Sequence, residues 1–304
     1  MQTCLRAASA LFPQRSGFYK MSDSRPQLSF EFFPPRNDEA AASFRTARAK
    51  LAALGPEYMS VTFGAGGSTR SRTRDTVLDI QEATSIPAAP HISCMAEDED
   101  SLLELLKDYE ASGIRRLVAL RGDRPSGGGS GVFDYAVDLV RFIRDRTGDL
   151  FHLEVAGYPE HHPESSSPER DLEHLKAKVD AGANGVITQY FFNSDAFFRF
   201  VDDARNLGVD VPIVPGIMPI TNFSRLARFS RMCGAEIPLW IGKRLENWEK
   251  AGDNESIRAF GEDAVAALCE KLIDAGVPGL HFYTLNRARP TLGLCHRLGW
   301  SEVP

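Results

Sequence analysis

Short apolar runs alternate with amphipathic stretches along this chain from residue 28 onward. Each run has the length and the β-branched or aromatic content of a buried strand, whereas each following stretch repeats its apolar residues with the period of a helix. Glycines close the helical stretches, as expected where a helix ends in the left-handed conformation. The predicted strands are residues 28–33, 58–63, 88–94, 116–120, 152–157, 185–190, 212–217 and 280–284, and the closing glycines are Gly55, Gly113, Gly148, Gly182, Gly208 and Gly276.

This alternation predicts eight strand–helix units in a chain of 304 residues. A closed (β/α)8 TIM barrel takes about 250 residues. We therefore expect a single α/β domain of this kind at residues 28–300. An open doubly wound sheet is the alternative architecture.

Residues 1–27 precede the predicted barrel, and we expect them to be a disordered N-terminal extension. The first 20 residues hold Arg6, Arg15 and Lys20 and no acid, which is compatible with an organelle-targeting peptide. The interpretation that we favour is a dispensable extension, with Met21 as the true start of translation.

The composition narrows the classes of function. With 43% hydrophobic residues the chain can build a large core. Its formal net charge is -6 and its basic residues are scattered, so we expect no nucleic-acid partner. No apolar stretch approaches the roughly 18 residues of a membrane-spanning helix, so we expect no membrane partner and a cytoplasmic location. The widely spaced cysteines, which we expect to be free thiols, are Cys4, Cys94, Cys233, Cys269 and Cys295.

One carboxylate interrupts the first predicted strand, which reads Leu-Ser-Phe-Glu-Phe-Phe. The flanking phenylalanines indicate burial, and a carboxylate out of water costs on the order of several kcal/mol unless it is protonated or hydrogen-bonded. A buried, protonated Glu31 would be a proton donor. The alternative is a Glu31 at the exposed end of the strand, bonded to a backbone amide or an arginine. The segment alone does not decide between them.

Polar residues stand at the carboxyl ends of most predicted strands. In a (β/α)8 barrel the active site forms at this end, in the loops that lead to the helices. A single polar residue at a strand end is more often a helix cap or a turn former. Polar residues at the ends of most of the strands together indicate an active site at this end of the barrel. These tips are Glu31, Thr62, His91, Arg121 with Asp123, Tyr158 with His162, Gln189, and Asn286 with Arg287.

The chain matches common nucleotide-binding and metal-binding motifs only weakly. The glycine-rich segment 64–70 could hold a phosphate, but Ser68 stands where the dinucleotide fingerprint needs its third glycine, and no P-loop lysine follows. His161 and His162 lack a further ligand at a suitable spacing, so we predict no metal. The run 127–129 is typical of a flexible surface loop, with a lid as the alternative.

Six short segments form a set that is far more specific than any of these motifs. They are Ser-Phe-Glu-Phe-Phe-Pro-Pro at 29–35, Ser-Val-Thr-Phe-Gly-Ala at 60–65, Ala-Pro-His-Ile-Ser-Cys at 89–94, Leu-Arg-Gly-Asp at 120–123, Ile-Thr-Gln-Tyr-Phe-Phe at 187–192 and His-Phe-Tyr-Thr-Leu-Asn-Arg at 281–287. In order and spacing this set resembles the methylenetetrahydrofolate reductase family, in its short bacterial form. The resemblance covers residues 28–299 and implies a barrel that holds FAD.

The resemblance implies a ping-pong reaction. NADH, or less often NADPH, would pass a hydride to FAD, which would then reduce methylenetetrahydrofolate to methyltetrahydrofolate and so supply methyl groups for methionine synthesis. Protonation of the departing folate nitrogen would help the bridging ring to open, and the family assigns this task to the glutamate that matches Glu31. Asp123 matches a catalytic aspartate near the flavin and the pterin. As an ordinary turn residue it would instead cap the next helix.

The resemblance also implies a set of FAD-binding positions. Lys178 among them would place a positive charge near the diphosphate. His174 and Ala177 depart from the family pattern, because asparagine and a basic residue are common there, and this weakens the diphosphate assignments. The candidates are Thr62, Phe63, Ala65, His91, Arg121, Gly122, Asp123, Tyr135, Ala136, Tyr158, His162, Ser165, Asp171, His174 and Lys178.

Substrate contacts are implied at five positions. Gln189 matches a residue that meets folate and nicotinamide in turn, and Arg287 matches one that meets the anionic tail of the folate. Phe229 matches an aromatic residue that stacks on nicotinamide, Arg225 lies near a position where glutamine is common, and Asp123 would also grip the pterin. Related bacterial enzymes form homo-oligomers, and we expect the same here.

Two other functions remain open on the sequence alone. One is another FAD-dependent barrel dehydrogenase, acting on an amino acid or an imine. The other is a barrel that binds folate or flavin as a sensor, without turnover.

Overall fold

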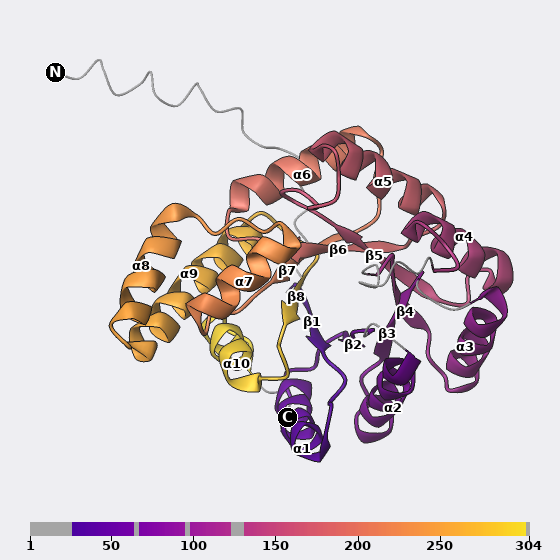
Figure 1. Cartoon of the computed structure of the whole chain (residues 1–304), viewed down its shortest axis with the longest axis horizontal. Helices are drawn as coiled ribbons and strands as arrows, with labels where there is room; N and C mark the ends of the chain where they lie inside the picture. The colour runs from indigo at the N-terminus through magenta and orange to yellow at the C-terminus, as the bar shows by residue number, and fades with distance from the viewer. Residues whose placement is uncertain (1–25, 64–66, 95–97, 123–130, 302–304) are drawn as a thin grey trace.

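The computed structural model describes residues 26–63, 67–94, 98–122 and 131–301, without the side chains of 67–70. Its eight strands are parallel, pair in chain order and close into a barrel as β1 meets β8 (Figure 1). With helices outside this barrel, the domain is a (β/α)8 TIM barrel, as predicted. The predicted extension and Met21 lie outside the described residues, apart from the start of β1.

Each strand begins and ends within two residues of its prediction. The continuous apolar character of the runs explains the agreement, since the side chains on both faces of a barrel strand are largely buried. The strands are β1 (Gln27–Phe32), β2 (Tyr58–Val61), β3 (Ala88–Ser93), β4 (Arg116–Leu120), β5 (His152–Gly157), β6 (Gly185–Tyr190), β7 (Ile213–Ile217) and β8 (Gly279–Tyr283).

The helices form an outer ring (Figure 1), and all six predicted closing glycines have positive φ. The prediction of one helix per strand was wrong between β7 and β8, where three helices follow one another. Gly234 ends the first of them in the left-handed conformation, and Pro238 precedes the second. The helices are α1 (Asp38–Ala52), α2 (Gly67–Ala83), α3 (Glu99–Ala111), α4 (Ala136–Thr147), α5 (Pro168–Asp180), α6 (Ser194–Asn206), α7 (Phe223–Cys233), α8 (Leu239–Lys250), α9 (Asn254–Asp274) and α10 (Ala288–Arg297).

The two faces of β1 show how the sequence divides the core. Phe30 and Phe32 belong to the large apolar core under the helices, where Phe32 packs edge-on against Phe44 of α1 at 5.4 Å between ring centroids. Ser29 and Glu31 alternate with them and therefore point into the barrel. The interior is thus partly polar.

A charged cluster fills the amino-terminal end of the barrel. Arg116, the first residue of β4, lies 2.6 Å from a carboxylate oxygen of Glu57 and 2.7 Å from one of Glu154. Its guanidinium carbon also lies 4.3 Å from the ring centroid of Tyr58. Because two carboxylates and an aromatic face compensate the buried guanidinium, this cluster closes the bottom of the barrel without an unpaired cation.

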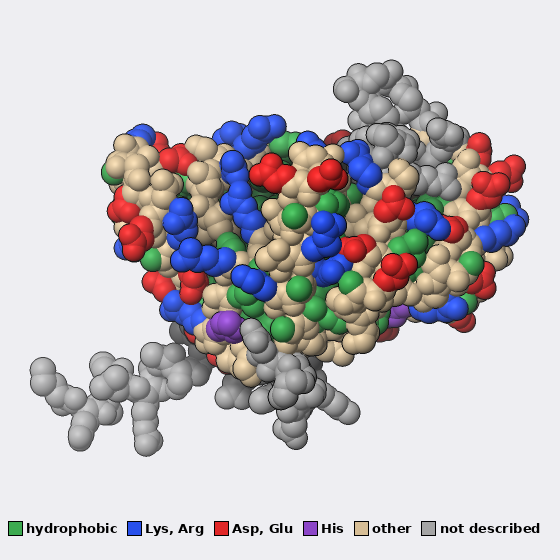
Figure 2. Space-filling model, turned by 90° about the horizontal axis from the view of Figure 1, so that it is seen from below, with side chains coloured by type: hydrophobic (Ala, Val, Ile, Leu, Met, Phe, Trp, Pro, Cys, Tyr) green, Lys and Arg blue, Asp and Glu red, His purple; other side chains and the backbone are tan. Residues whose placement is uncertain are grey.

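The outer surface mixes charges of both signs. The face drawn in Figure 2 carries Lys and Arg side chains interspersed with Asp and Glu, with small apolar areas between them. Within the described part of the chain, no helix is both long and apolar enough to cross a membrane.

Gly216 of β7 offers a test of the packing between β6, β7 and β8. A Cβ atom there would lie 2.1 Å from the Thr188 carbonyl oxygen and 2.6 Å from the Tyr283 ring. Since neither neighbour can retreat, we expect Gly216→Ala to lower the free energy of unfolding by about 3 kcal/mol in urea titrations. Gly252→Ala, at φ 72° in open space, is the control and should cost only about 1 kcal/mol. Equal losses in the two variants would contradict this description.

Candidate active site

The carboxyl group of Glu31 lies at the mouth of the barrel between two imidazoles. Its Oε2 atom is 3.4 Å from Nε2 of His91 and 3.7 Å from Nε2 of His281, and its side chain is only 12% exposed. Two imidazoles, rather than a backbone amide or an arginine, face this carboxylate. The side chain is thus largely enclosed, as one of the two sequence interpretations expected, and the role of Glu31 as a proton donor stays a prediction.

His91 is neutral at physiological pH. Burial lowers its pKa to about 4, against the opposing effect of the Glu31 carboxylate. The Nε2 atoms of both His91 and His281 are buried and lack a hydrogen-bond partner. The neutral His91 ring therefore forms no salt bridge with the Glu31 carboxyl group.

Three further residues that the sequence analysis missed hold His281 in place. Ser29 Oγ lies 2.7 Å from its Nδ1 atom, Tyr58 stacks on the ring at 5.9 Å, and Tyr283 meets it edge-on at 5.4 Å. A signal was present, because Ser29 stands two residues before Glu31 on the same strand face, as His281 does before Tyr283.

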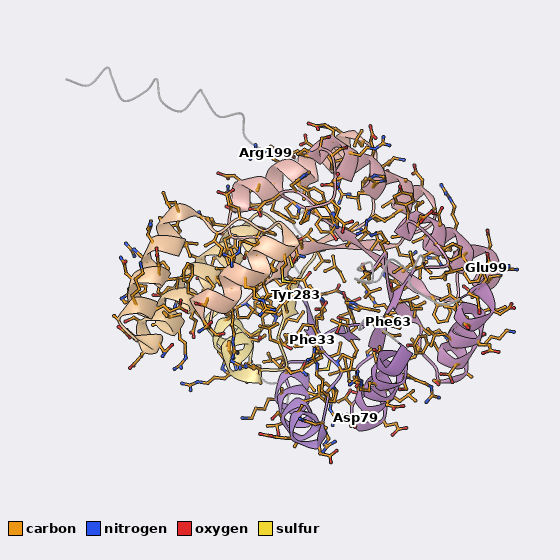
Figure 3. All side chains as sticks on the ribbon, viewed as in Figure 1. Phe33, Phe63, Asp79, Glu99, Arg199 and Tyr283 are labelled. Carbon is orange, nitrogen blue, oxygen red and sulfur yellow. The ribbon has the colours of Figure 1, made fainter. Side chains whose placement is uncertain are left out.

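The lip of the barrel beside Glu31 is built from the end of β8. Thr284 Oγ1 donates a 2.6 Å hydrogen bond to the backbone oxygen of Glu31. Asn286, at φ 58°, uses its side-chain amide to bond both the backbone nitrogen and the backbone oxygen of Phe33, each at 2.8 Å. Figure 3 shows Phe33, Phe63 and Tyr283 near the centre of the ring, whereas Asp79, Glu99 and Arg199 lie on its helical periphery.

A second group of candidate residues forms around the loop after β5 and the start of α5. The rings of Tyr158 and His162 meet edge-on at 4.6 Å between centroids. Asp171 Oδ2 accepts a 2.9 Å bond from the backbone nitrogen of His162 and lies 3.3 Å from His161 Nδ1. Burial, followed by the charge of Arg121, lowers the pKa of His162.

Lys178 is a partly buried cation within this second group. Its Nζ atom donates a 2.6 Å hydrogen bond to the Ala156 carbonyl. Burial lowers its pKa to about 8, although Asp171 opposes the shift. No carboxylate of the described residues lies within ion-pair distance of Nζ. Lys178 can therefore receive an anionic ligand.

Other candidates surround these two groups. Arg121 forms a 2.6 Å ion pair with Glu164, and Gly122 has φ 81°. The exposed ring of Tyr135 stacks on His174 with centroids 6.0 Å apart. Asp123 and Ala65 lie outside the described residues.

The remaining candidates are described by their individual contacts. Thr62 accepts a bond from Thr73 at its backbone oxygen, Ser165 Oγ donates to the Ser167 carbonyl, and Gln189 Oε1 accepts from the Tyr190 nitrogen. Phe63 is half-buried beside Thr62, and Ala136 is the first residue of α4. Arg225 and Phe229 on α7 and Arg287 before α10 are exposed, and no side-chain contact of theirs joins them to Glu31.

Cysteines and metal-ligand clusters do not add to this site. Among the described residues, no group of three or more His, Cys, Asp or Glu side chains could hold a metal ion. Cys94, Cys233, Cys269 and Cys295 are free thiols, as expected. Burial raises the pKa of Cys94 and Cys295 to about 12, so neither thiol is activated.

Comparisons with known proteins agree with the resemblance. A family model described as "Methylenetetrahydrofolate reductase" matches residues 19–299. The 5,10-methylenetetrahydrofolate reductase of Pectobacterium carotovorum is 42% identical over 275 residues, which cover 90% of this chain and 91% of that protein. That of Escherichia coli K12 is 40% identical over 272 residues, 90% of each chain.

Two further matches are less similar. A rice protein named "Probable methylenetetrahydrofolate reductase (NADH)" is 37% identical over 295 residues, which cover 92% of this chain but 49% of that protein. A solved structure of an uncharacterized Clostridium thermocellum protein that binds two copies of 5-methyl-5,6,7,8-tetrahydrofolic acid has a TM-score of 0.67 at 16% identity, covering 90% of this chain and 93% of that one. This structural likeness shows the shared fold alone.

Glu160 ties the loop after β5 to the segment after α7. Its Oε2 atom accepts a 2.6 Å bond from the backbone nitrogen of Glu236, while its Oε1 atom is buried without a partner. Burial, with a contribution from the Glu236 charge, raises the pKa of Glu160 to about 7. The folded protein therefore binds this proton more tightly than the unfolded chain does.

This raised pKa predicts a pH-dependent effect of Glu160→Gln on stability. The stabilising contribution of the protonated carboxyl is complete below the ordinary pKa of 4.5 and is lost as the pH rises through about 7. Glutamine cannot ionise, so the melting temperature of the variant should rise relative to the native protein between about pH 5 and pH 8. Glu104→Gln, on an exposed face of α3, is the control and should show no such trend. A constant difference for Glu160→Gln would contradict the assignment.

Proposed function

The chain belongs to the methylenetetrahydrofolate reductase family, and on that premise we propose that it reduces methylenetetrahydrofolate to methyltetrahydrofolate, with FAD as its flavin cofactor and Glu31 as its acid. The observation that supports this proposal is the buried Glu31 carboxyl group at the mouth of the barrel, facing two imidazole nitrogens that have no other partner. The comparisons do not favour the alternative dehydrogenase of amino acids or imines.

Glu31 serves as the general acid of the folate step. The bridging ring of the substrate opens when the departing nitrogen takes a proton, and the resulting iminium accepts the hydride. Glu31 supplies that proton from the wall of the barrel, where burial excludes competing water and no arginine or lysine of the described residues pairs with the carboxylate. General acid catalysis of this kind contributes about 100- to 10,000-fold to a rate.

The described residues around the mouth fit FAD. The buried amine of Lys178 bonds a single carbonyl, so it retains donors for a diphosphate. The exposed ring of Tyr135, stacked on His174, offers a flat surface beside it. Two further residues of the proposed set, Ala65 and Asp123, lie outside the described residues. The set is completed by Thr62, Phe63, His91, Arg121, Gly122, Ala136, Tyr158, His162, Ser165 and Asp171.

When bound, FAD would supply a carrier that accepts a hydride from NADH or NADPH and later delivers it to the folate. The name of the rice relative favours NADH. Gln189 and Phe229 are proposed to meet the nicotinamide, with Gln189, Arg225, Arg287 and Asp123 meeting the folate. The basic side chains would attract the anionic folate tail, since Arg225 and Arg287 are exposed at the tips of their elements.

The cellular setting is proposed on the same premise. The enzyme acts in the cytoplasm as a homo-oligomer, and its product supplies methyl groups for methionine synthesis.

Glu31→Gln separates the two half-reactions. The amide cannot donate the proton, so we expect methylenetetrahydrofolate-driven flavin reoxidation to slow at least about 100-fold in anaerobic stopped-flow experiments. Reduction of the flavin by NADH needs no such proton and should stay within about twofold of the native rate, which makes it the internal control. Near-native reoxidation by folate would show that another group is the acid.

Lys178 predicts the pH dependence of FAD binding. A diphosphate beside the amine would raise its pKa above the value of about 8 that burial sets in the free protein. Below about pH 8 the lysine is charged in both the free and the FAD-bound protein, so the affinity for FAD is constant. Above about pH 8 the lysine of the free protein is neutral and must take up a proton when FAD binds. The FAD dissociation constant, followed by flavin fluorescence, should therefore rise by up to about tenfold per pH unit above pH 8.

Two variants test the assignment to this lysine. Lys178→Met should bind FAD more weakly and lose the rise above about pH 8. Lys176→Met, on the same helix but paired with Asp180, should keep both the affinity and the rise. Retention of the rise in Lys178→Met would assign it to another group.

A further inference from the structure

The His281 imidazole is fully buried inside the barrel, yet only one of its nitrogens has a hydrogen-bond partner. Nδ1 lies 2.7 Å from Ser29 Oγ, whereas Nε2 faces Glu31 Oε2 across 3.7 Å, slightly beyond a hydrogen bond. A buried polar atom without a partner costs about 1–3 kcal/mol. An apolar side chain would fill this space at lower cost, so packing alone does not account for the imidazole.

The surroundings fix the plane of this ring. Tyr58 stacks beneath it at 5.9 Å and 25°, and Tyr283 meets it edge-on at 5.4 Å and 85°. Both tyrosines are themselves held, Tyr58 by the Arg116 guanidinium at 4.3 Å and Tyr283 by a 2.7 Å bond from its hydroxyl to the Thr188 carbonyl. With Ser29 on Nδ1, the ring has one orientation, and that orientation aims Nε2 at Glu31.

We propose that Ser29 and His281 form a positioning pair that holds the acidic proton of Glu31, a role that rests on the proposed reductase function. In this arrangement His281 carries its proton on Nδ1 and donates it to Ser29 Oγ. The Nε2 lone pair then accepts the O–H of Glu31, and a small shift of the carboxyl group closes the 3.7 Å gap. His281 neither gains nor loses a proton in the step, because the proton passes from Glu31 to the folate nitrogen.

The groups around the Glu31 carboxyl group are compatible with this hydrogen bond. The titratable groups of the described residues that face its carboxyl group are His91, His281 and Tyr283. His91 is neutral, and the hydroxyl of Tyr283 is bonded to a backbone carbonyl. The Nε2 lone pair would repel a carboxylate and accept a hydrogen bond from a carboxylic acid. Ser29 and His281 would therefore hold the proton on Glu31 between turnovers.

Ser29→Ala tests the pair through the pH profile of the folate half-reaction. Without the Nδ1 acceptor, His281 is free to carry its proton on Nε2 and to stabilise the carboxylate. We expect reoxidation by methylenetetrahydrofolate to slow about tenfold at neutral pH, with its decline at high pH shifted to lower pH by about one unit. Flavin reduction by NADH should be unchanged. Ser29→Thr keeps the hydroxyl and should restore the profile.

Ser60→Ala is the matched control. Ser60 pairs with Glu31 in the register of β1 and β2, is fully buried, and its hydroxyl has no partner. Its loss should leave both half-reactions and the pH profile unchanged. If Ser29→Ala behaves like Ser60→Ala, the positioning role is overturned.

Nitrogen-15 NMR of His281 in the substrate-free native protein provides a second test that requires neither turnover nor a variant that folds. A neutral ring protonated on Nδ1 supports the pair, whereas a proton on Nε2 or a charged ring overturns it. If the native protein fails to reoxidise with methylenetetrahydrofolate, the proposed function fails. The NMR result then still decides the arrangement of Ser29 and His281.

Discussion

The burial of one carboxyl group inside a closed barrel is the constraint on which the site depends. Phe30 and Phe32 anchor β1 in the outer core, and the two-residue repeat of a strand then sends Glu31 inward. A carboxylate in that position needs a cation, hydrogen bonds or a proton. The neutral imidazole of His91 provides no positive charge of the kind that Arg116 provides at the other end. The sequence of β1 therefore places Glu31 between two imidazoles rather than beside an arginine or lysine of the described residues.

The two ends of the barrel use buried charge in different ways. At the amino-terminal end, Arg116 is compensated by Glu57, Glu154 and the face of Tyr58, which suits a role in stability. At the carboxyl end, the Lys178 amine bonds only a carbonyl oxygen, and two imidazole nitrogens lack partners. Unsatisfied groups of this kind destabilise an empty protein and become favourable once a ligand pairs them. At the carboxyl end these groups lie where active sites form in this architecture.

The sequence predicted what depends on local pattern and missed what depends on register. Apolar runs and closing glycines located all eight strands within two residues, because both signals are local. The polar tips located Glu31 and His91, which the barrel brings to within 3.4 Å. The support of His281 by Ser29 joins residues 252 apart in sequence, and only the closure of β1 onto β8 creates it. The two extra helices between β7 and β8 were missed because three helices in succession break the strand–helix rhythm.

His91 connects the proposed cofactor site with the proton donor. It belongs to the FAD candidates, and its Nε2 atom lies 3.4 Å from Glu31. A charged histidine there would stabilise the Glu31 carboxylate and so weaken the acid, whereas burial lowers the pKa of His91 to about 4 and keeps it neutral. In the proposed function, the same wall of the barrel would meet the flavin on one side and hold the Glu31 carboxyl group on the other. In the proposed function, nicotinamide and folate would meet the flavin at this same end of the barrel, and the proposed ping-pong order would let them occupy it in turn.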